Sequence, residues 1–123
     1  MITLYDRKGF DALLTLEGST LKGADLSHAN LHNANLVEYN LSGANLRGAI
    51  LTSADLRLAN LTGADLTGAD LSDADLSGCC LDDAKLEGVK IEGTKFALEH
   101  HKALRAAGIK LAGLPLELSL KNK

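Results

Sequence analysis

The chain has 123 residues, a formal net charge of −3, and four aromatic residues, namely two Tyr and two Phe. This length predicts a single domain, and with so few large aromatic side chains the core has to consist of leucine and alanine. The sequence shows no apolar run long enough to cross a bilayer and no signal-peptide pattern at its start, so we expect a soluble, cytoplasmic protein with no membrane partner. Residues 14–98 carry twelve acidic and six basic side chains, which argues against a nucleic-acid partner for this part, because such a surface is basic.

Residues 1–13 precede a repeat and predict an N-terminal cap. The run IleThrLeuTyr at 2–5 favours a short strand. We expect Leu4, Phe10 and Leu13 to shield the start of the repeat, because an open end of a stacked repeat exposes core side chains and unpaired backbone.

Residues 14–98 read as seventeen copies of one five-residue pattern: small, Asp or Asn, Leu, polar, Gly. The third letter is apolar throughout, at every fifth residue from Leu16 to Leu86 and then at Ile91 and Phe96. The first and third letters alternate as in a strand, so their side chains point to the same side. Glycine at the fifth letter suits the positive φ of a type II turn. A corner after each short side gives a coil with Leu and Ala inside, which must be stacked and capped to be stable.

Some corners lack glycine. Asn33, Asp73 and Asp83 are acceptable substitutes, whereas Glu38, Ser53 and Leu58 are expected to use another turn type. The Asp or Asn before each central residue is expected to accept hydrogen bonds from backbone N–H groups of the following turn.

The pentads AlaAspLeuThrGly at 64–68 and AlaAspLeuSerAsp at 69–73 resemble the motif of the pentapeptide repeat proteins. The resemblance implies a mainly β fold, a right-handed quadrilateral β-helix (solenoid), here of about four coils. Four pentads per coil place residue n beneath residue n + 20. Three aspartates then stack on three lysines: Asp65, Asp70 and Asp75 on Lys85, Lys90 and Lys95. A three-sided coil would set Lys95 against Cys80, so the residues favour four sides.

Val37, Ile50 and Leu58 are apolar at positions that should face water. In the twenty-residue frame, Val37 and Leu58 share a face and Ile50 lies on the adjoining one. They are candidate partner contacts, with ordinary scattered surface residues as the alternative. Tyr39 occupies a position that is otherwise small, and we expect it to fill a local gap.

The chain offers no convergent set of catalytic or metal-binding side chains. His28 and His32 fall on different faces, and His100 and His101 are neighbours that point apart on a helix. Cys79 is expected to face inwards and Cys80 outwards, which suits neither a disulfide nor a metal. We therefore expect no metal, no cofactor and no enzymatic activity.

Residues 99–123 predict a capping helix and a tail. Thr94 is a candidate N-cap for a helix that begins near Phe96, and Gly108 is a candidate stop. From Leu114 to Leu120 the sequence alternates like a strand with one wet face, and Pro115 restricts that strand to an edge. The tail residues proposed for partner contact are Leu116, Leu118 and Leu120. The tail could fold back along the helix and the N-terminal strand, or form a homodimer.

The sequence predicts a rigid, non-enzymatic scaffold that binds an unidentified protein partner. The family resemblance implies an alternative, because some pentapeptide repeat proteins are acidic rods that mimic DNA and modulate a type II topoisomerase such as gyrase. The acidic repeat is compatible with that role, whereas the lysines at 85, 90 and 95 speak against it.

Overall fold

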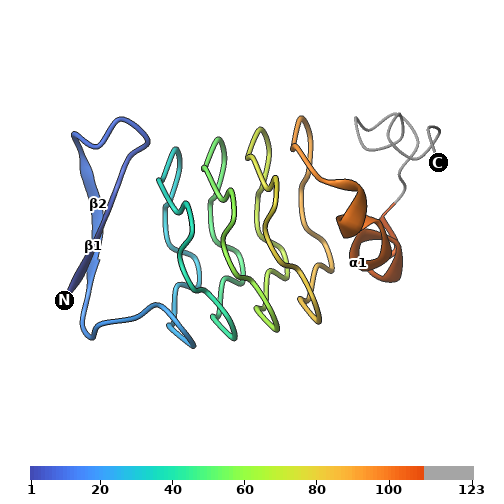
Figure 1. Cartoon of the computed structure of the whole chain (residues 1–123), viewed down its shortest axis with the longest axis horizontal. Coiled ribbons are helices and arrows are strands. Elements are labelled where there is room, and N and C mark those ends of the chain that lie inside the picture. The colour runs from blue at the N-terminus through green and yellow to red at the C-terminus, as the bar shows by residue number, and fades with distance from the viewer. Residues whose placement is uncertain (110–123) are drawn as a thin grey trace.

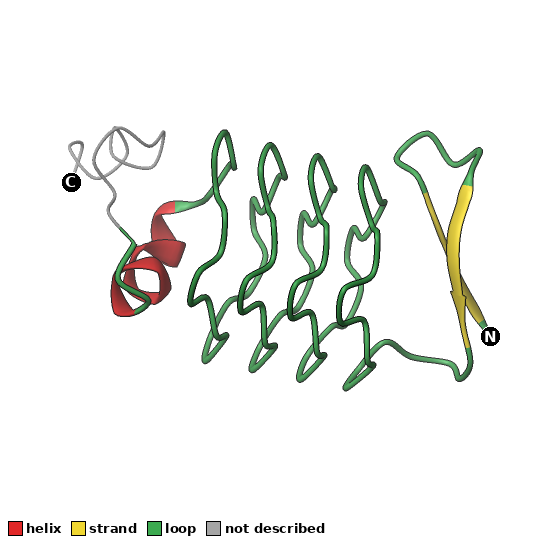
Figure 2. Ribbon diagram, turned by 180° about the vertical axis from the view of Figure 1, so that it is seen from behind, coloured by secondary structure: helices red, strands yellow, loops and turns green. Residues whose placement is uncertain are grey.

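The computed structural model describes residues 1–109, apart from the side chains of Leu98 and His101. The chain begins with an antiparallel hairpin of β1 (Ile2–Tyr5) and β2 (Ala12–Leu16), continues through stacked loops, and ends in the 3-10 helix η1 (Leu98–His100) and the helix α1 (His101–Ala106). The hairpin and α1 lie at opposite ends of the stack (Figure 1). Seen from behind, the stacked part consists of loops and turns whose successive copies run in parallel (Figure 2).

Parallel backbone bridges join the second residue of successive pentads to the residue twenty positions further on. They run without interruption from Asp25–Asn45 to Asp75–Lys95. Each bridge is made by two hydrogen bonds, as where the Leu26 N–H donates to the Asn45 carbonyl at 2.8 Å and the Asn45 N–H donates to the Ala24 carbonyl at 2.9 Å. The predicted stacking interval of twenty residues is confirmed, and each coil is held to the next by backbone.

The corners have the two features that a type II turn requires. The Ala49 N–H donates to the Leu46 carbonyl at 3.0 Å, and Gly48 between them has a φ of +66°. The expectation that Glu38, Ser53 and Leu58 use another turn type is wrong, because their φ values are +64°, +59° and +63°. The backbone N–H of the fifth residue of a pentad also donates to a carbonyl of the next coil, as from Ser53 to Ser72 at 2.9 Å. Stacking therefore holds these residues in the left-handed conformation.

The core is one column of leucine and alanine that runs the length of the stack. It begins at Leu4 in β1, continues through every central leucine from Leu21 to Leu86, and ends at Leu104 in α1. Because Leu4 and Leu104 have no exposed surface, both flanking elements contribute to the same hydrophobic cluster as the coils.

The N-terminal hairpin differs from its prediction in two respects. β2 extends to Leu16, so the first pentad, 14–18, lies largely in the hairpin rather than in a coil, although the sequence pattern places the boundary at 13/14. Phe10 is 82% exposed and does not shield the first coil, whereas Leu4 is buried there as expected. The hairpin joins the stack through the Asn35 N–H, which donates to the Tyr5 carbonyl at 2.8 Å.

At the other end, Thr94 does not cap a helix. Its buried hydroxyl donates to the Leu71 carbonyl at 2.6 Å, and α1 has no side-chain cap. The predicted stop at Gly108 is confirmed, with a φ of +78° and bonds from the Gly108 and Ile109 N–H groups to the carbonyls of Arg105 and Leu104, which form a Schellman motif. No helix within residues 1–109 is long and apolar enough to cross a membrane. The predicted tail strand, with Leu116, Leu118 and Leu120, lies outside the described residues.

Candidate interaction surfaces

The three apolar residues singled out in the sequence lie on the outside of the coils. Ile50 is 40% exposed, Leu58 is 59% exposed, and Val37 is half-buried. Along the coil, Ile50 and Leu58 are separated by the polar corner at Ser53 and by the ion pair of Asp55 with Arg57. The structure therefore gives two separate apolar spots rather than one patch.

Leu58 occupies a corner that most pentads give to glycine. Its φ of +63° is a conformation that costs an ordinary side chain about 1–2 kcal/mol. Its side chain leans over Gly78 in the next coil, where an added Cβ would stand 2.8 Å from the Leu58 Cδ2. Glu38 and Ser53 share this conformation, so the feature that distinguishes Leu58 is its large exposed apolar side chain.

Where the second letter of a pentad is Asp or Asn, its side chain fixes the following turn, as predicted. The Asn60 and Asp65 Oδ1 atoms each accept a bond from the N–H two residues on, at 3.0 Å. Hydrogen bonds from the Thr67 hydroxyl and N–H, reinforced by the Arg47 guanidinium, lower the pKa of Asp65 to about 2. The Asp65 carboxylate therefore stays charged at neutral pH while it holds its turn.

Ion pairs on the outside differ from the predicted stacks. Among residues 1–109 the charged contacts are Arg47–Asp65 at 3.0 Å and Arg57–Asp55 at 2.7 Å. The register does place Asp70 beside Lys90, and the lysine adds to the Ser72 hydrogen bonds that lower the pKa of Asp70. Lys90 and Lys95 thus lower the pKa of Asp70 and Asp75 through their charge, without a direct ion pair.

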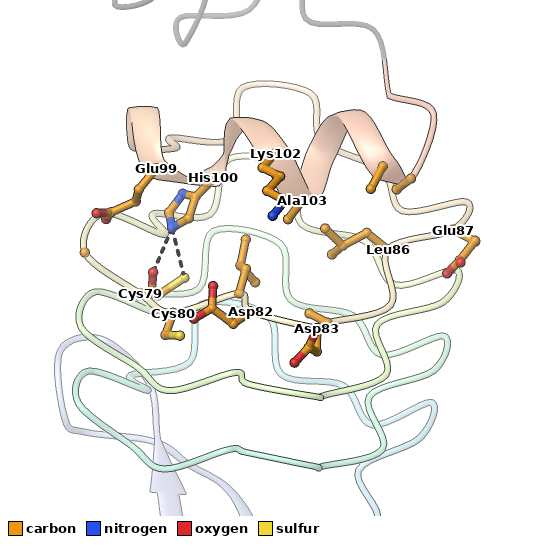
Figure 3. Close-up of a pocket in the computed structure, with 15 residues that line it drawn as sticks. Cys79, Cys80, Asp82, Asp83, Leu86, Glu87, Glu99, His100, Lys102 and Ala103 are labelled. Atoms are coloured by element: carbon orange, nitrogen blue, oxygen red, sulfur yellow. Dashed lines mark hydrogen bonds between the residues drawn. The ribbon is translucent and has the colours of Figure 1, made fainter.

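A groove of about 670 Å³ opens between α1 and the coil segment 78–87 (Figure 3). Its apolar surface comes mainly from the alanines of α1, because Leu81 and Leu86, which also line it, are almost fully buried. The charged residues that line it are four carboxylates and one amine: Asp82, Asp83, Glu87, Glu99 and Lys102. Figure 3 shows Lys102 pointing from α1 toward the segment that carries Asp82 and Asp83. The groove is therefore lined more by polar than by apolar surface, and most of its charged residues are acidic.

His100 closes one end of this groove and is almost fully buried. Its Nδ1 accepts a bond from the Ala97 N–H at 3.0 Å, so its Nε2 carries the proton and donates to the Cys79 carbonyl at 2.8 Å (Figure 3). In the preceding coils the equivalent carbonyls of Tyr39 and Ala59 accept from backbone N–H groups. The sequence did not predict this role, because no local pattern shows that the Cys79 carbonyl lacks a backbone donor and that His100 supplies one from twenty-one residues further on.

The two cysteines are free and face opposite sides, as predicted. Cys79 is buried, and burial raises the pKa of its thiol to about 12. Cys80 is half-exposed in the groove, with its Sγ 3.2 Å from the Thr62 hydroxyl. Only Cys80 can therefore meet a reagent from solvent while the chain is folded.

The histidines do not converge on a metal. His32 Nδ1 lies 2.7 Å from the Thr52 hydroxyl, and the His28 ring lies over Gly48. In the part of the chain that the structure describes, no three His, Cys, Asp or Glu side chains stand close enough to hold a metal ion.

Comparisons with known proteins agree on the repeat. The family model described as pentapeptide repeats matches residues 15–48 and 40–78 with eight copies, which together cover more than half of the chain. No curated protein matches the sequence.

Among solved structures, the chain is similar to a pentapeptide repeat protein of the Arabidopsis thaliana thylakoid lumen, with 34% identity and a TM-score of 0.61 over 63% of this chain and 53% of that one. It is also similar to HetL, a pentapeptide repeat protein involved in heterocyst differentiation regulation in the cyanobacterium Nostoc, with 42% identity and a TM-score of 0.49 over 55% of this chain and 36% of that one. QnrB1, a plasmid-mediated fluoroquinolone resistance protein, matches at 21% identity with a TM-score of 0.27, over 85% of this chain and 76% of that one.

The aligned part spans about half of the Arabidopsis chain and about a third of HetL. The family model and the twenty-residue register rest on the same pentads. The chain therefore belongs to the pentapeptide repeat family, whose members form right-handed quadrilateral β-helices.

Proposed function

We propose that this protein is a non-enzymatic scaffold, a right-handed quadrilateral β-helix closed by the N-terminal hairpin and by α1, that binds a protein partner through its exposed corners. The interior is filled by leucine and alanine from Leu4 to Leu104, so small molecules have no access to the core of the stack. The outer surface is mostly polar, and backbone ladders hold the coils that carry it in a fixed register. Such a body offers a rigid, preorganised surface, which reduces the entropic cost of binding.

The observation that carries this proposal is Leu58. Leu58 is 59% exposed and has a φ of +63°. This backbone conformation destabilises the fold by about 1–2 kcal/mol, and the side chain is not buried in the core in return. Contact with a partner would recover that cost, because large apolar side chains dominate the energy of protein interfaces. Ile50 and half-buried Val37 are secondary contacts in this proposal.

The test compares partner capture by the wild type and by L58N. Asparagine tolerates the left-handed conformation, so the corner is retained while the apolar contact is removed. S53N is the matched control, since Ser53 has a similar φ of +59° at another corner. We expect a specific protein from the native source that binds the wild type and S53N and binds L58N at least tenfold more weakly. Equal capture by all three proteins, or no specific capture, would contradict the proposal.

A DNA-mimicking modulator of a type II topoisomerase such as gyrase is the second candidate. The carboxylates of Asp25, Asp65 and Asp70, whose pKa values are lowered by turn hydrogen bonds, support an acidic exterior. The arginines that pair with Asp55 and Asp65 interrupt it, so we rank this role below the scaffold. A gyrase supercoiling assay distinguishes them, because a mimic would alter supercoiling at stoichiometric protein and a scaffold for another partner would not.

We place the protein in the cytoplasm, as the sequence predicts. Fractionation of the native cell tests this location, and recovery in a lumenal or membrane fraction would overturn it.

A further inference from the structure

The buried ring of His100 uses both of its nitrogens to hold the C-terminal cap, which comprises η1 and α1. The side chain is 2% exposed, and the ring packs edge to face against Phe96 at a centroid distance of 5.8 Å. Its Nδ1 accepts from the Ala97 N–H while its Nε2 donates to the Cys79 carbonyl (Figure 3). Only a neutral ring can make both bonds, because Nδ1 has to offer a lone pair.

A second proton on this ring is incompatible with the closed cap. Protonation at Nδ1 would set one N–H donor against the Ala97 N–H, so that bond would be lost. It would also place a positive charge in a buried site, which is costly without a partner of opposite charge. Among residues 1–109 no carboxylate forms an ion pair with His100. The protonated ring is therefore accommodated only when the cap is open.

The titratable groups around the ring come from three elements. Glu99 in η1 and Lys102 in α1 are both exposed, and Figure 3 shows the Glu99 carboxylate pointing away from the ring. His101 follows in α1, and its side chain lies outside the described structure. The coil segment beneath the ring carries the others, which are Cys79, Cys80, Asp75 and Asp82. The Cys79 Sγ is 3.7 Å from Nε2 but supplies no negative charge, because burial raises the pKa of this thiol to about 12.

We propose that His100 is an acid-operated release for the C-terminal cap, so that uptake of one proton breaks its bonds to Ala97 and Cys79 and frees η1 and α1 from the last coil. The cap contributes Leu104 to the core cluster, and Leu81 and Leu86 in the coil are 3% and 2% exposed beneath it. Release uncovers these leucines, so the rod gains an apolar end in acid alone.

The expected pH range follows from the proton count. An exposed histidine takes up its proton at about pH 6.5, and only the open cap binds that proton. The ratio of open to closed molecules therefore rises by up to about tenfold for each pH unit below this value. The carboxylates that hold the turns, such as that of Asp65, stay charged throughout this range, so the coils themselves remain intact.

The test uses Cys79 as the reporter of an open cap. In full-length C80S this buried thiol is the only one in the chain, and 4,4′-dithiodipyridine reacts with thiols in acid as well as at neutral pH. Dividing the rate for the folded chain by the rate for the same chain unfolded in urea removes the pH dependence of the reagent. We expect this ratio to rise by about tenfold or more from pH 7.5 to pH 5.0.

Two matched variants in the C80S background assign the effect to one ring. H100Q keeps an N–H group that can donate to the Cys79 carbonyl but does not titrate, so its ratio should change by less than twofold over the same range. H101Q removes the neighbouring histidine and should retain the rise. A flat profile without either substitution, the same rise in H100Q, or a flat profile in H101Q would overturn the proposal.

Hydrogen exchange in the wild type provides a second test that needs no variant to fold. The N–H groups of Ala107 and Ile109 donate to carbonyls of α1 and should lose protection over the same pH range. The Leu46 N–H donates to the Asp65 carbonyl in the middle of the stack and should keep its protection. Loss at all three would indicate general unfolding and would overturn the proposal, as would full protection at Ala107 and Ile109. Neither result bears on partner capture through Leu58.

Discussion

The His100 ring donates to the Cys79 carbonyl from the place where the next coil would donate with its backbone. The Asn60 N–H bonds the Tyr39 carbonyl and the Cys80 N–H bonds the Ala59 carbonyl, at 2.9 and 3.0 Å. His100 is the next residue in that series, but its own N–H bonds the Ala97 carbonyl within the η1 turn. Its Nε2 bonds the Cys79 carbonyl at 2.8 Å instead. One side chain thus ends the backbone ladder and fastens the terminal helix.

The first prediction concerns this bond. H100F keeps an aromatic ring of similar size but leaves the Cys79 carbonyl and the Ala97 N–H without partners, which costs about 1–3 kcal/mol. The urea midpoint should fall accordingly. K102A, an exposed change on α1, should change the free energy of unfolding by no more than about 0.5 kcal/mol. A midpoint for H100F equal to that of K102A would show that the bond does not hold the helix.

The second prediction concerns stacked corners. Gly63 and Gly78 have φ values of +67° and +72°, but an added Cβ meets nothing at Gly63 and meets the Leu58 side chain at Gly78. G63A should therefore cost about 1–2 kcal/mol of unfolding free energy, and G78A should cost slightly more, because the exposed Leu58 side chain has to turn aside. In an L58A background the two substitutions should cost the same. A double-mutant cycle in urea gives the coupling, and a coupling of zero would mean that Leu58 does not cover Gly78.

The third prediction concerns acid stability. The pKa of Asp65 falls from 3.8 to about 2 on folding, so its carboxylate contributes stability that is complete above about pH 4 and is lost as the pH falls toward 2. Asn60 makes the same turn bonds without a titratable group. D65N should thus show a smaller loss of urea midpoint between pH 4 and pH 2 than the wild type. N60D should show a larger one, and parallel curves for all three proteins would refute the linkage.

The fourth prediction concerns thiol chemistry. With a pKa of about 12, Cys79 is protonated at any pH at which the protein is handled, and it is also shielded by the core. Iodoacetamide at pH 8 should therefore add one group, at Cys80, and C80S should take up none. C79A, which restores the residue typical of that position, should still take up one. Two additions to folded wild-type protein would show that the last coil opens.

The sequence predicted those features that repeat. The stacking of Asp65 on Lys85 follows from counting pentads, and the turn bond from Thr67 to Asp65 follows from the chemistry of aspartate before a corner. Both depend on interactions that recur along the stack, so the repeated pentads provide many copies of the same evidence for them. The twenty-residue register and the burial of the central leucines were therefore readable without coordinates.

The sequence failed where the next coil overrides a local preference. Leu58 disfavours a positive φ, yet its N–H is held by the Ser77 carbonyl at 3.1 Å, and that bond requires the same corner as in the neighbouring coils. Thr94 has the composition of a helix cap, but burial directs its hydroxyl to the Leu71 carbonyl. The groove was missed for a similar reason, since it forms between Asp82 and Lys102 only when α1 lies on the last coil.

The twenty-residue register also limits how such a chain can change its length. Inserting one pentad between Gly48 and Ala49 would keep every leucine inside, because the five-letter rule is unbroken. It would nevertheless rotate everything before it by a quarter turn against everything after it, and Arg47 would face a different side from Asp65. Gain or loss of a single pentad therefore changes which outer faces of neighbouring coils are aligned. Gain or loss of four pentads at once lengthens or shortens the rod and leaves its faces aligned.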